Sequence, residues 1–142
     1  MKTFLTSDEE LAVVEEIRNL ETRTSGEVRV AITGKWIFRT ERYAWKMFHK
    51  LGMSRTVARN GALIVVIRRR RRFVVLGDAG ISAVVGPGYW EMIANTMSSH
   101  LKDGERLAAL IAGIRVLGET MATHWPPEES DRNELPNEIA QE

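Results

Sequence analysis

The chain has 142 residues, of which 44% are hydrophobic and 27% charged, as is typical of one folded domain. It contains no cysteine, which excludes thiolate nucleophiles, cysteine-ligated zinc, iron–sulfur clusters and disulfides. The net charge of +1 hides a basic block at residues 35–72, which favours either an anionic partner or packing against the acidic segments on both sides.

Helical and strand patterns alternate through the first half of the chain. Ser7 and Glu10 have the form of a capping box, and the apolar spacing after them predicts a helix over residues 8–22. Alternating apolar residues from Glu27 predict a strand. A second helix is predicted over residues 42–51, and a helix between strands implies a crossover.

Two short apolar runs in the second half, residues 62–67 and 73–76, are typical of strands covered on both faces. Helical stripes follow over residues 90–101 and 107–121. We expect one domain over residues 1–126 and an acidic, proline-containing tail over 127–142, packed on the domain or extending from it. The N-terminus lacks the apolar run of a signal peptide and no stretch is long enough to cross a bilayer, so we expect a cytoplasmic protein.

This order of elements predicts a three-layer α/β/α sandwich with a small mixed sheet and helices on both faces. The first two strands are expected to be parallel, and the second and third to form an antiparallel hairpin. In that topology Glu27, Asn60 and Asp78 lie near one another at one edge of the sheet. The five arginines between the second and third strands lie at the opposite edge.

The carboxylate of Asp78 is the first candidate for a functional site. With Glu27 and Asn60 it offers the oxygen ligands that Ca²⁺ and Mg²⁺ require. Asp103 and Glu105 are second-rank metal candidates if their loop approaches the same edge, and their simpler role is to cap the last helix. The alternative for Asp78 and Asn60 is a pair of purely local turns.

Glycine-bearing backbone around Asp78 is a candidate for binding phosphate or another anion. A glycine there permits a positive φ and a close approach of the chain to an ion. The residues concerned are Gly77, Ala79 and Gly80.

The arginine run has two interpretations. It is either a solvated turn that blocks edge pairing or a binding patch for an anionic protein or membrane surface within the basic block. Nucleic acid is the less favoured partner because no recognition motif accompanies the run. The candidate partner-binding residues are Arg68, Arg69, Arg70, Arg71 and Arg72.

Four strings together resemble the TPM domain family: TSGEVRV (24–30), RNGALIVV (59–66), GDAGI (77–81) and NELPNE (133–138). The resemblance covers residues 8–138. It implies an α/β/α domain, a divalent-cation site in loops at one sheet edge, and an acid-phosphatase activity suggested for plant members. We therefore expect a cation-binding assembly factor, with a metal-assisted phosphomonoester hydrolase as the alternative, although no nucleophile is identifiable.

Overall fold

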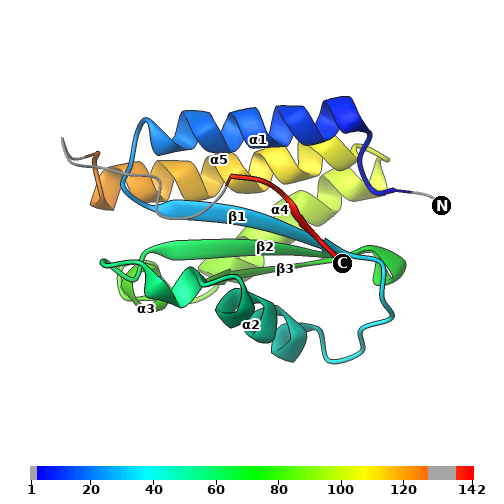
Figure 1. Ribbon diagram of the computed structural model, residues 1–142, viewed down its shortest axis with the longest axis horizontal. Helices are drawn as coiled ribbons and strands as arrows, with labels where there is room; N and C mark the ends of the chain where they lie inside the picture. Colours follow the sequence, from blue (N-terminus) through cyan, green and yellow to red (C-terminus); the bar gives the residue numbers. More distant parts are fainter. Residues whose placement is uncertain (1–2, 128–136) are drawn as a thin grey trace.

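The computed structural model describes residues 3–127 and 137–142 as one sheet with helices on both faces (Figure 1). Its strands lie in the order β3-β2-β1-β4, with β1 parallel to β2 and β4, and β2 antiparallel to β3. The elements, with 3₁₀ turns written η, are α1 (Ser7–Glu21), β1 (Glu27–Thr33), α2 (Thr40–Lys50), η1 (Met53–Arg55), β2 (Gly61–Ile67), η2 (Arg68–Arg70), β3 (Arg72–Gly77), α3 (Ala79–Ser82), α4 (Tyr89–Lys102), α5 (Arg106–His124) and β4 (Ala140–Gln141). The predicted three-layer α/β/α fold with a mixed sheet is confirmed.

The sheet separates two hydrophobic cores, and β2 contributes to both of them. Ala62, Ile64 and Val66 pack under α1, α4 and α5, whereas Leu63, Val65 and Ile67 pack against α2. Figure 1 shows these helices on the two faces of the sheet. Successive side chains of a strand point to opposite faces, so a strand covered on both sides has an unbroken apolar sequence.

Within the described residues no helix is long and apolar enough to cross a membrane, and the cellular compartment stays a prediction.

The N-terminal helix begins one residue earlier than predicted. Its N-cap is Thr6, not Ser7: the Thr6 hydroxyl accepts the Glu9 N–H at 3.2 Å, and the Glu9 carboxylate accepts the Thr6 N–H at 2.9 Å. The sequence TSDEE contains two overlapping capping boxes, so the pattern alone did not distinguish them. The one-turn helix α3 was not predicted either.

The end of the predicted tail joins the sheet as β4. Glu142 donates its N–H to the Ile32 carbonyl at 3.1 Å and accepts the Gly34 N–H at 3.2 Å. Its carboxylate lies 2.9 Å from the ammonium of Lys50 and 3.7 Å from that of Lys35. An acidic chain end therefore packs against the basic block. Residues 128–136 lie outside the described residues, and the division at residue 126 stays a prediction.

Tyr43 should titrate at unusually high pH because it packs beside this chain end. Burial and the hydrogen bond that its hydroxyl donates to Glu142 raise the pKa of Tyr43 from 10.0 to about 12. A pKa that is raised in the folded state stabilises the fold at pH values below the ordinary pKa of tyrosine. This contribution is lost as the pH rises from 10 through about 12. We expect tyrosinate absorbance from Tyr43 only in that upper range. A transition near the ordinary pKa that disappears in Tyr43→Phe would contradict the assignment.

Candidate functional site

The backbone brings Glu27, Asn60 and Asp78 together at one edge of the sheet, as the predicted topology requires. Glu27 begins β1 opposite Gly61, and its N–H points to the Asn60 carbonyl at 3.4 Å. Asp78 follows β3, and its N–H donates to the Gly61 carbonyl at 2.9 Å. All three residues are buried, with exposed fractions of 3%, 1% and 4% for Glu27, Asn60 and Asp78.

The Asp78 carboxylate is held by Arg59, a residue that the sequence analysis did not single out. Arg59 Nε lies 2.6 Å from Oδ2 and Nη2 lies 2.7 Å from Oδ1, so the pair is bidentate. Burial alone would raise the pKa of Asp78, but the bonds from Arg59 and from the Ala79 N–H hold that pKa below its ordinary value. The pair is unequal, because the Arg59 side chain is 53% exposed and that of Asp78 only 6%.

The loop after β3 uses its polar backbone internally. Asp78 Oδ1 accepts the Ala79 N–H at 2.7 Å as the N-cap of α3, and the Gly80 N–H donates to the Arg59 carbonyl at 2.9 Å. An anion at Gly77, Ala79 and Gly80 would have to replace these two bonds. The positive φ expected of a glycine there does not occur. Instead, a Cβ on Gly77 would meet the Trp90 ring at 2.1 Å, so this glycine provides packing space.

The turn before β2 contains buried oxygens with no hydrogen-bond partner among the described residues. They are the Asn60 Oδ1 and the Thr56 Oγ1, in residues exposed by 1% and 3%. Between them Arg59 adopts a φ of +53°, which is uncommon for a residue other than glycine. Carbonyl and carboxylate oxygens are ligands suited to Ca²⁺ and Mg²⁺, so the donor set of Asn60, Glu27 and Asp78 fits a hard cation.

The structure does not bring Asp103 and Glu105 to this edge. Asp103 is the C-cap of α4 and Glu105 occupies the N-cap position of α5, so their loop adjoins Lys102 and Arg106. Glu105 makes no capping hydrogen bond and lies 3.3 Å from His100 Nδ1. Across residues 3–127 and 137–142 no three His, Cys, Asp or Glu side chains are grouped to hold a metal ion. Only two of the four predicted carboxylates, Glu27 and Asp78, therefore lie at the edge with Asn60.

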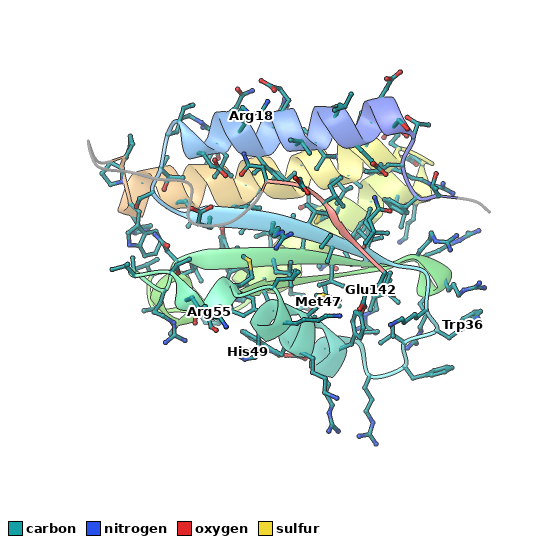
Figure 2. The ribbon with its side chains drawn as sticks, viewed as in Figure 1. Arg18, Trp36, Met47, His49, Arg55 and Glu142 are labelled. Atoms are coloured by element: carbon teal, nitrogen blue, oxygen red, sulfur yellow. The ribbon has the colours of Figure 1, made fainter. Side chains whose placement is uncertain are left out.

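The five arginines lie at the other end of the sheet, as predicted. Arg69 Nε donates to the Gly34 carbonyl at 2.6 Å, and its guanidinium lies 5.6 Å from the Trp36 ring centroid. Arg70 Nη1 donates to the Phe38 carbonyl at 3.0 Å. We call this surface the arginine end, formed by Trp36, Phe38, Arg68, Arg69, Arg70, Arg71, Arg72, Lys102 and Arg106. Figure 2 shows Trp36 at one end of the molecule and Arg55 toward the other.

The arginine end contains residues that the sequence analysis did not assign to a site. Trp36 precedes the helix predicted over residues 42–51 and lies outside its apolar stripe, and that position was the available signal for an exposed aromatic residue. Phe38 and Arg106 gave no such signal, since only the tertiary fold brings the loop before α2 and the start of α5 to the arginine turn.

The chain matches the TPM domain over residues 1–120. It resembles the NMR structure of the BA42 protein from the psychrophilic bacterium Bizionia argentinensis, with 36% identity, a TM-score of 0.91, and 100% of this chain and 98% of that chain covered. The N-terminal domain of a protein from P. gingivalis shares the fold at 17% identity and a TM-score of 0.73, covering 92% of this chain and 82% of that one. No curated protein matches. With most of its length matched, the chain belongs to the TPM domain family.

Proposed function

We propose that this TPM-domain protein binds a divalent cation, Ca²⁺ or Mg²⁺, at the edge formed by Glu27, Asn60 and Asp78. The observation that supports the proposal most is the buried Asn60 Oδ1, which lacks a hydrogen-bond partner in the described part of the chain. Leaving such an acceptor unsatisfied costs about 1–3 kcal/mol. A cation coordinated by this oxygen and by the Asp78 and Glu27 carboxylates would offset that cost.

Arg59 determines how the cation would reach Asp78. Its guanidinium already neutralises the carboxylate through two bonds of 2.6 and 2.7 Å, so a cation on Asp78 has to displace it. More than half of the Arg59 side chain is exposed, and it can turn to solvent without opening the core. The Asp78 carboxylate would therefore be bound either by the Arg59 guanidinium or by a divalent cation from solution.

The role that best suits such a site is that of a binding or assembly factor. Cation binding and release would rearrange the turn at residues 56–60 and the loop after β3, which form one surface. A second surface is available at the arginine end, where Arg68–Arg72 would dock on an anionic protein or membrane surface. This role needs no nucleophile.

A second candidate is a metal-assisted phosphomonoester hydrolase, and the exposed, bidentate guanidinium of Arg59 favours it. Arg59 would turn from Asp78 to the phosphoryl oxygens, for which its planar fork is well matched. Glu27, Asn60 and Asp78 would hold the cation in position. The bound cation would supply the charge that polarises the phosphoryl oxygens and activates water.

A Ca²⁺ titration followed by backbone amide NMR shifts tests the cation site. We expect perturbations at residues 26–28, 56–61 and 77–80, and a loss of affinity of more than about a hundredfold in Asp78→Asn. Asp103→Asn is the matched control, because it removes the same charge at the other end of the sheet. Shifts confined to residues 102–106, or lost binding in the control alone, would contradict the placement.

The same two variants separate the enzyme from the binding factor. If the protein is a hydrolase, turnover of a simple phosphomonoester requires the cation and falls by orders of magnitude in Asp78→Asn but not in Asp103→Asn. Turnover that is equal in both variants would point to a contaminating phosphatase.

A further inference from the structure

The arginine end carries positive charge that no acid neutralises within the described residues. None of its seven basic side chains is within ion-pair distance of a described carboxylate, although Arg59, Lys35 and Lys50 elsewhere in the basic block all have acidic partners. The charges come from segments far apart in sequence, namely the turn between β2 and β3 and the loop between α4 and α5. The fold therefore concentrates positively charged side chains on one surface.

Two hollows of about 280 Å³ each lie between these basic side chains. Both are lined by Arg68, Arg71 and Arg106, and one is also lined by Trp36 and the other by Lys102. A water molecule occupies about 30 Å³, so each hollow has room for a phosphate group with its hydration. Guanidinium groups from two separate elements would donate to it in the bidentate manner typical of arginine and phosphate.

Two large aromatic side chains extend from the same surface. Trp36 is 59% exposed and Phe38 is 76% exposed, and their rings stack with centroids 6.5 Å apart. Arg69 and Arg70 each lie 5.6 Å from one of these ring centroids and also bond the carbonyls of the same loop. The rings are thus held outward by their neighbours, and exposed apolar groups beside a charged rim indicate a docking surface.

We propose that the arginine end docks on a bilayer surface that contains anionic phospholipids. Arginines beside exposed Trp and Phe suit the headgroup region, where phosphates meet the guanidinium groups and the aromatic rings enter the boundary of the acyl chains. Single-stranded nucleic acid is less favoured, because bases stack on open ring faces and Arg69 and Arg70 already lie over these rings. The proposal rests on the docking role of the arginine turn and is independent of the cation site.

Vesicle sedimentation of the full chain tests the proposal without added divalent cation. We expect binding to vesicles of phosphatidylcholine mixed with phosphatidylglycerol, weakening with salt, and little binding to phosphatidylcholine alone. Arg71→Gln/Arg106→Gln should reduce the partition coefficient by at least about tenfold. Arg18→Gln/Arg55→Gln removes the same charge elsewhere and should leave it unchanged, and circular dichroism would establish that both variants are folded.

Quenching of tryptophan emission by brominated lipid tests whether the aromatic loop enters the bilayer. We expect quenching in the wild-type chain, and its loss in Trp36→Phe while vesicle binding persists. Equal binding to charged and neutral vesicles would overturn the proposal, as would equal losses in the two double variants. Retention on heparin without any vesicle binding would also overturn it and would assign the surface to a soluble polyanion.

Discussion

Replacing Gly80 with alanine is expected to lower the free energy of unfolding by about 3 kcal/mol, the upper part of the usual range for overpacking. A Cβ at this position would lie 2.5 Å from the Ala58 carbonyl oxygen and 2.6 Å from that of Arg59. These are backbone atoms, which cannot rotate away as a flexible side chain does. The chain would have to separate the turn before β2 from the loop after β3, which the Gly80 N–H now joins to the Arg59 carbonyl at 2.9 Å.

Chemical denaturation of Gly80→Ala and Gly86→Ala provides the measurement and its control. A Cβ on Gly86 has no neighbouring atom within 4 Å, and its φ is not in the left-handed region. We expect Gly86→Ala to change stability by less than about 0.5 kcal/mol in either direction. Because the Gly80 N–H joins the loop after Asp78 to the turn that precedes Asn60, its replacement should move these two ligands apart and also weaken Ca²⁺ binding. Equal stabilities for the two variants would show that the contact between the two loops is easily relaxed.

The sheet edge was predictable because strand pairing follows from local patterns. An apolar run beginning at Ala62 and an alternating run beginning at Glu27, joined by a helix, indicate parallel strands that start at the same edge. The hairpin then returns Asp78 to that edge, whatever the surrounding side chains are. The same logic placed the arginine run at the opposite edge, since it is the hairpin turn itself.

Other features depend on contacts that no local pattern encodes. Arg59 meets Asp78 across 19 residues of sequence, from a turn before β2 in which Arg59 adopts a left-handed conformation. The position of Asp103 and Glu105 depends on the direction of α4, which carries their loop to the arginine end. The pairing of β4 involves two residues, too few to give a strand signal, and it is determined by the ion pairs and backbone bonds of Glu142.

Replacing Arg59 with glutamine is expected to tighten Ca²⁺ binding by about tenfold. A cation and the Arg59 guanidinium compete for one carboxylate, so the free energy that the pair contributes opposes cation binding. Solvent screens a bidentate, charge-assisted pair that has one exposed partner, so the expected gain is limited to about that factor. Glutamine keeps the side chain as far as Cδ and a polar end, leaves the backbone carbonyl that accepts the Gly80 N–H, and removes the positive charge.

Arg55→Gln is the matched control, because Arg55 is exposed in the preceding η1 turn and forms no ion pair with any described residue. Calorimetric titration of both variants with Ca²⁺ separates competition for Asp78 from a general effect of charge. Competition predicts a gain in Arg59→Gln several times larger than in Arg55→Gln, and no binding by Asp78→Asn/Arg59→Gln. If the wild-type chain binds Ca²⁺ and Arg59→Gln binds it equally well, the cation does not displace Arg59. Its site would then lie on Glu27 and the oxygens of the 56–60 turn, without the Asp78 carboxylate.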